Sequence, residues 1–103
     1  MSLMNQFTEL TDAKSIEALY QKSVIDSYQD FRKMRDLWDI LDNQMWKAWE
    51  DNTIDAKIVY VYDRLKQDLE KRTKLAHWAK KFRARGDEHG AEDIEKKILD
   101  FKS

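Results

Sequence analysis

The chain lacks several residue types that usually interrupt or cross-link a fold. It has no proline and no cysteine, and its only glycines are Gly86 and Gly90. Without proline or glycine before Gly86, no strong helix breaker occurs over most of the chain. Without cysteine, disulfides and thiolate metal sites are excluded. Two glycines are also too few to build a glycine-rich loop that cradles phosphate.

Long apolar runs are missing as well. No segment has the roughly 20 apolar residues of a membrane-spanning helix, and nothing resembles a signal peptide. We therefore expect a cytoplasmic protein. The 103 residues correspond to a single helical domain, residues 1–103, of which residues 1–10 are expected to form a poorly ordered leader.

Apolar residues recur at helical spacing over residues 11–51, where Phe31 and Trp38, for example, are seven positions apart. A seven-residue repeat is typical of helices that lie side by side at a shallow angle. The pattern predicts one amphipathic helix, or two helices nearly in line. Thr11 or Asp12 is the expected N-cap.

A polar stretch over residues 50–55 predicts a turn, with Asn52 or Thr53 capping a second helix. A strand-like run follows it, but no second such run exists for pairing, and its apolar residues keep helical spacing. Gly86 is the expected left-handed residue at the end of the second helix. Asp87 is then the expected N-cap of a short third helix.

These segments predict an all-α fold, in which a long antiparallel helical hairpin and a short C-terminal third helix form an elongated bundle. The third helix is expected to cover Trp78 and Phe82, which lie about a quarter turn from the earlier apolar stripe of the second helix. The residues around Gly86 resemble the corner of a tetratricopeptide-type helical hairpin. Because the likeness occurs once, it predicts a shared corner and not membership of that family.

The first helix is apolar over about half of its circumference, which is more than one partner helix covers. We therefore expect a homodimer. The predicted oligomer surface consists of apolar residues at the margins of this stripe, namely Leu19, Ile25, Leu37, Ile40 and Trp46.

Large side chains also gather near the predicted turn between the two long helices. They are Met45, Trp46, Trp49, Tyr60 and Tyr62. Such a cluster forms core more often than it forms a ligand site, so we expect core. An exposed Trp46 would overturn that expectation.

One segment is distinctive in its charge. Residues 71–86 hold seven basic residues and no acidic one, whereas acids outnumber bases in residues 1–63 and 87–103. The candidate surface for an anionic partner consists of Lys71, Arg72, Lys74, Lys80, Lys81, Arg83 and Arg85. The favoured interpretation is a solvated helix end paired with acidic neighbours. The alternative is a surface for an acidic protein or, less favoured because no base-reading element is evident, for nucleic acid.

No catalytic, cofactor or metal site is predicted. Neither Glu-x-x-His nor His-x-x-x-His occurs, so His77 and His89 are each expected to be a surface or helix-end residue. Asp36, Asp39 and Asp42 have some likeness to the acidic motifs of all-helical nucleotide pyrophosphohydrolases, but steps of three residues wind them around the helix. They are expected to form a solvated face.

We therefore expect a non-catalytic helical interaction or adaptor protein that needs no cofactor. The alternative function is a nucleic-acid-associated regulator that uses the basic segment over residues 71–85. A metal-dependent nucleotide hydrolase is a more distant alternative.

Overall fold

Helices account for most of the described chain in the structure, a computed structural model that describes residues 2–51 and 55–101. The helices are α1 (Leu3–Thr8), α2 (Ala13–Ser27), α3 (Phe31–Glu50), α4 (Ala56–Ala84) and α5 (Glu88–Ile98). No strand occurs among these described residues. The predicted all-α fold is confirmed.

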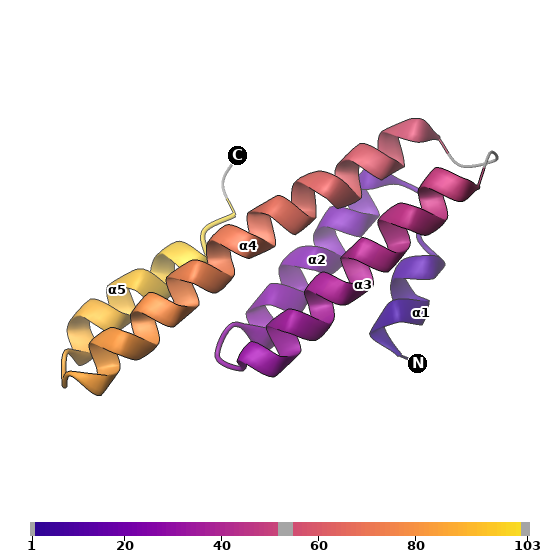
Figure 1. The fold of residues 1–103 in the computed structure, drawn as a ribbon. Coiled ribbons are helices and arrows are strands. Elements are labelled where there is room, and N and C mark those ends of the chain that lie inside the picture. Colours follow the sequence, from indigo (N-terminus) through magenta and orange to yellow (C-terminus); the bar gives the residue numbers. More distant parts are fainter. Residues whose placement is uncertain (1, 52–54, 102–103) are drawn as a thin grey trace.

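The centre of the molecule is an antiparallel hairpin of α3 and α4 (Figure 1). Because α4 has 29 residues and α3 has 20, the C-terminal part of α4 extends beyond α3. Phe31, the first residue of α3, stacks on His77 of α4 with ring centroids 4.0 Å apart, and this stack marks the level at which the overhang begins. The short α5 folds back along the overhang, so the predicted long hairpin with a third helix is confirmed.

The chain reverses direction between α2 and α3, so the prediction of one helix or two helices in line is wrong (Figure 1). At the end of α2, the Ser27 hydroxyl donates 2.6 Å to the carbonyl of Ser23. The carboxylate of Asp30 then accepts from two backbone N–H groups in the first turn of α3 and caps it. The apolar repeat does not reveal this reversal, because both helices bury their stripes in the same core.

Residues 2–10 do not form the expected poorly ordered leader. The Phe7 side chain of α1 is fully buried and meets Tyr62 edge-on, with ring centroids 6.2 Å apart. The Gln44 side-chain amide of α3 donates 3.0 Å to the Thr8 hydroxyl. A buried aromatic ring and a hydrogen bond thus make α1 part of the bundle.

The start of α2, the end of α4 and the start of α5 agree with the local sequence signals. Asp12 caps α2 by accepting 2.9 Å from the backbone N–H of Ser15. Gly86 has a φ of 83°, the left-handed conformation that glycine adopts without strain. Asp87 caps α5 by accepting 2.8 Å from the N–H of Gly90. All three assignments are confirmed.

The connection between α3 and α4 contains Asn52 and Thr53, whose predicted capping role lies outside the described residues. Asp55 caps α4 by accepting 2.9 Å from a backbone N–H of its first turn. The strand-like run that follows is helical, as predicted. Ile58 and Tyr62, about one helical turn apart, are both buried.

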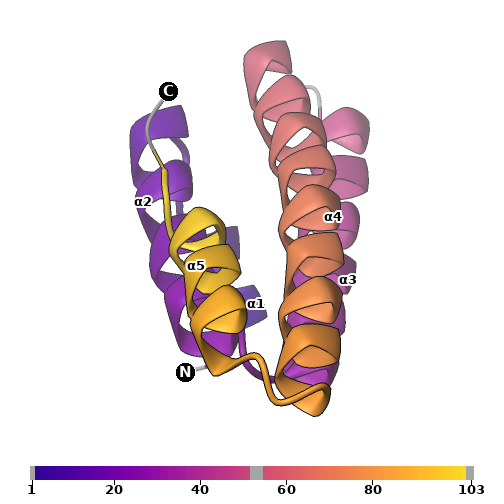
Figure 2. The same cartoon turned by 90° about the vertical axis from the view of Figure 1, so that its left-hand side faces the viewer.

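The core lies between the α3–α4 hairpin and a second layer, in which α2 and α5 lie on the same side of the hairpin (Figure 2). The largest fully buried side chains are Phe7, Ile16, Tyr20, Val24, Met34, Leu37, Leu41, Leu69 and Ile98. The folded-back α2, together with α1, therefore helps to bury the wide apolar face of α3. The elongated bundle measures 51 × 26 × 19 Å.

The helix α5 packs against a different face of α4 from the one predicted. The small residues Ala76 and Ala79 of α4 and Ala91 of α5 are buried, whereas Trp78 is 50% exposed. Phe82 is only partly buried. Small side chains allow two helix axes to approach closely. This explains why α5 packs against the face of α4 that carries the alanines. The expectation that α5 covers Trp78 and Phe82 is therefore wrong.

Candidate functional site

Arg72, one of the seven predicted anion-binding residues, makes its contacts within the protein. Its Nε lies 2.6 Å from Oδ2 of Asp68, and its Nη1 donates to the backbone carbonyls of Ile98 and Asp100. The guanidinium also lies over the ring of Phe101, 4.2 Å from its centroid. Arg72 thus connects the chain after α5 to α4, and its guanidinium is not available to bind a partner protein.

Arg83 is paired within the α4–α5 corner. Its Nη2 lies 2.7 Å from Oε1 of Glu95, and its Nε lies 2.9 Å from Oε1 of Glu88. These hydrogen bonds raise the pKa of Arg83 above its usual value, the bond to Glu95 contributing most. The bond to Arg83 in turn lowers the pKa of Glu95. Pairing with acidic neighbours, predicted for the whole segment, is found here and at Arg72.

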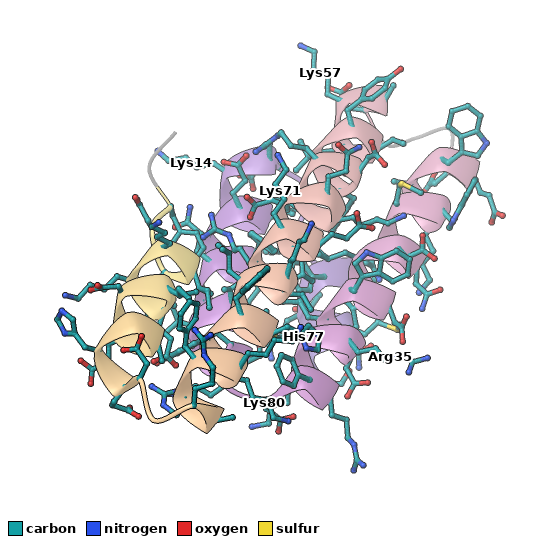
Figure 3. The ribbon with its side chains drawn as sticks, turned by 60° about the vertical axis from the view of Figure 1, so that its left-hand side comes forward. Lys14, Arg35, Lys57, Lys71, His77 and Lys80 are labelled. Atoms are coloured by element: carbon teal, nitrogen blue, oxygen red, sulfur yellow. The ribbon has the colours of Figure 1, made fainter. Side chains whose placement is uncertain are left out.

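Lys80 points away from the remaining cations. It is nine residues after Lys71, which places the two on opposite faces of α4 at 100° per residue. Its Nζ lies 5.2 Å from the centroid of the Phe31 ring of α3. Figure 3 shows Lys71, His77 and Lys80 along α4.

The other four cations share one exposed face of α4 with two aromatic side chains. Their spacings of three, four, seven and eight residues are those of neighbours on a helix surface. We call this set the basic–aromatic stripe: Lys71, Lys74, Trp78, Lys81, Phe82 and Arg85. Its lysines and arginine form no ion pair with any side chain in the described ranges.

Within the stripe, cations lie against aromatic rings. Lys81 Nζ is 5.6 Å from the centroid of the Trp78 ring, and Arg85 Cζ is 4.6 Å from that of Phe82. The two rings are themselves 6.4 Å apart. These contacts hold long cationic side chains beside exposed apolar surface.

A second exposed group lies where α3 and α4 are joined (Figure 1). The exposed fractions are 53% for Trp46, 68% for Trp49 and 72% for Tyr60. Of the cluster that was expected to form core, only Tyr62 is buried, while Met45 is partly buried. That expectation is wrong for the three exposed residues, which we call the aromatic end.

The residues predicted for an oligomer surface do not share one surface. Leu37 is 1% exposed and belongs to the core, and Leu19 and Ile40 are partly buried against it. Ile25 and Trp46 are exposed, but Ile25 lies near the α2–α3 connection and Trp46 lies near the far end of α3 (Figure 1). Only Trp46 remains in the candidate site.

The acidic and histidine residues are dispersed. Asp36 and Asp39 are exposed, whereas Asp42 pairs with Lys66 at 2.6 Å. His77 stacks on Phe31, as described above, and His89 is an exposed residue of α5 near its N-terminus. Within residues 2–51 and 55–101, no three histidine, aspartate or glutamate side chains are placed to hold a metal ion together.

In the described part of the chain, no helix combines the length and the apolar character needed to cross a membrane. Comparison with protein-family models, with curated proteins and with solved structures gives no match. Function is therefore inferred from the aromatic end and the basic–aromatic stripe.

Proposed function

We propose that the protein is a non-catalytic interaction protein that binds other protein chains through exposed helix faces, and that the aromatic end joins two copies into a homodimer. The observation that carries this proposal is the exposure of Trp46, Trp49 and Tyr60 at one end of the hairpin. Large aromatic side chains gain much free energy from burial, and tryptophan and tyrosine are enriched in the centres of protein interfaces.

The charges beside the aromatic end suit a second copy of the same chain. Exposed residues of both signs flank the aromatic side chains, namely Lys47, Glu50, Asp55 and Lys57. In a two-fold dimer the same patch meets itself, so it must be self-complementary. A patch with both signs meets this condition, whereas a patch of one sign repels its copy.

Light scattering tests the proposal. At about 100 μM, a dimer with a Kd near 1 μM is almost fully formed, so wild type is expected at about twice the monomer mass. The monomer mass is 12.4 kDa. A double variant, Trp46→Ser with Trp49→Ser, is expected to be monomeric, because the two largest exposed rings of the patch are lost.

Ile25→Ser is the matched control, since it removes an exposed apolar side chain far from the aromatic end. It should leave the mass unchanged. A monomeric wild type would contradict the homodimer. Equal dimer masses for wild type and the tryptophan double variant would contradict the aromatic end as its interface.

A further inference from the structure

The overhanging part of α4 is covered by α5 on one face only. The covered face carries the buried Ala76 and Ala79, and the opposite side carries the half-exposed Trp78. A further helix packed on the open side of α4 would form a three-helix arrangement with α4 and α5. No helix of the described chain takes that place.

The positive charge of the stripe indicates the charge of the partner that binds to it. Four cations and no acid make up the stripe, so two copies of the stripe repel each other. We propose that the basic–aromatic stripe docks an acidic amphipathic helix of a partner protein. This inference rests on the proposed function in that the protein acts by binding protein chains, but it concerns a different surface.

The dimensions of the stripe suit a short helix. Lys71 and Arg85 are 14 positions apart, which corresponds to about 21 Å along α4, or about four helical turns. A partner helix of that length presents carboxylates at spacings of three and four residues to the cations of the stripe. Its apolar side chains then pack between them against Trp78 and Phe82.

The aromatic rings add apolar contacts to the charge attraction between the stripe and such a partner. Trp78 is 50% exposed and lies beside Lys81, so a docked apolar side chain would bury ring surface and reduce the access of water to the neighbouring ion pairs. Central aromatic residues surrounded by charged ones are the usual arrangement of interface hot spots. Because Lys81 and Arg85 already lie against rings, less side-chain freedom is lost on binding.

Nucleic acid fits the stripe less well. Exposed acids, Glu70 and Asp87, lie at its two ends, so a longer polyanion meets repulsion beyond about four turns. Single strands are usually bound in basic grooves with free ring faces on which bases stack. Here the stripe is the exposed face of one helix and not a groove.

Fluorescence anisotropy with a synthetic probe tests the inference on the full chain. The probe is a labelled peptide of about 16 residues, long enough for four helical turns, with glutamate and leucine at amphipathic spacing. The control peptide has glutamine at every glutamate position. We expect wild type to bind the glutamate peptide at least about tenfold more tightly than the glutamine peptide.

Two charge-reversed proteins locate the site. Lys74→Glu with Lys81→Glu should weaken binding of the glutamate peptide by at least about tenfold. Lys14→Glu with Lys22→Glu changes the net charge equally at exposed lysines of α2, outside both the stripe and the aromatic end, and Figure 3 labels Lys14. This control should bind the peptide almost as wild type does. Trp78→Ala should also weaken binding, although it alters no charge.

Several results would overturn the inference. They are no binding of the glutamate peptide, equal binding of both peptides, equal effects of the two charge-reversed proteins, or unchanged binding by Trp78→Ala. Single-stranded or duplex DNA bound more tightly than the peptide at about 50 mM salt, with collapse by about 200 mM, would assign the stripe to nucleic acid instead.

The dimer and the docked helix are tested separately. The double variant Trp46→Ser with Trp49→Ser leaves the stripe intact and should bind the glutamate peptide as wild type does. Lys74→Glu with Lys81→Glu should retain the mass of wild type in light scattering. Failure of one proposal is thereby distinguished from failure of the other.

Discussion

The Tyr20 hydroxyl of α2 donates a hydrogen bond of 2.5 Å to the carboxylate of Asp68 on α4. The same carboxylate oxygen also accepts 2.6 Å from Nε of Arg72, which in turn holds the chain after α5. Burial, together with the bond to Asp68, raises the pKa of Tyr20 above its usual value. Tyr20 and an Asp68–Arg72 pair one helical turn apart on α4 thus connect α2, α4 and the end of α5.

Removing the hydroxyl with Tyr20→Phe should lower the free energy of unfolding by about 1.5–3 kcal/mol, the usual contribution of a hydrogen bond to a charged group. Urea denaturation followed by circular dichroism measures this change. Tyr60→Phe is the matched control, because Tyr60 is 72% exposed, and it should have almost no effect. Equal stabilities of the two variants would show that the Tyr20–Asp68 bond contributes nothing.

Phe7→Ala should destabilise the protein by about 3–5 kcal/mol, because it leaves a cavity in the core beside Tyr62. The same denaturation experiment measures the loss. Asn5→Ala changes an exposed residue of the same helix and should be almost neutral. If deletion of residues 1–10 also left stability unchanged, α1 would not belong to the bundle.

Ala79→Leu should destabilise the α4–α5 corner, because additional methyl groups at a buried contact force the two helices apart. Overpacking of this kind costs about 1–3 kcal/mol. Ala84→Leu, at an exposed position near the end of α4, is the control. Thermal melts that do not distinguish the two variants would argue against close packing of α5 on the alanine face.

The Arg83–Glu95 pair should make stability depend on pH. Because the pKa of Glu95 is lowered in the folded protein, the pair stabilises the fold above the unfolded pKa of Glu95. This contribution is lost as the pH falls through the folded value. Glu95→Gln should therefore melt at a lower temperature than wild type at neutral pH, and the difference should vanish in acid.

Melting temperatures measured over a pH series test this expectation, with Glu92→Gln as the control at an exposed position of α5. The control should follow wild type throughout. A difference between Glu95→Gln and wild type that stayed constant down to strongly acidic pH would exclude titration of Glu95 as its cause.

Local signals in the sequence predict much of the fold. Asp12, Gly86 and Asp87 act within one helical turn of their own positions, so their roles follow from residue type alone. At the reversal before α3 the local signal is Asp30, which caps α3, but no proline or glycine lies near it and the apolar repeat continues through it. Only the burial of both stripes in one core reveals that α2 folds back on α3.

The candidate site is predicted in part for a related reason. Helical spacing assigns Lys71 and Lys74 to one edge of α4 and Arg72 to the other. It does not reveal that Arg72 binds the carbonyl of Ile98, because that partner is 26 positions away. The exposure of Trp46 likewise depends on which elements cover the α3–α4 hairpin, and this is a property of the tertiary fold.

Because α4 extends beyond α3, its N-terminal and C-terminal parts should differ in their resistance to local unfolding. Up to His77, α4 is packed between α3 and the second layer, whereas further on its main neighbour is α5. Segments with fewer packed neighbours open at lower free energy and exchange their amide hydrogens sooner. The α4–α5 corner should therefore exchange faster than the central hairpin, and a partner bound to the stripe should slow that exchange there before it does elsewhere.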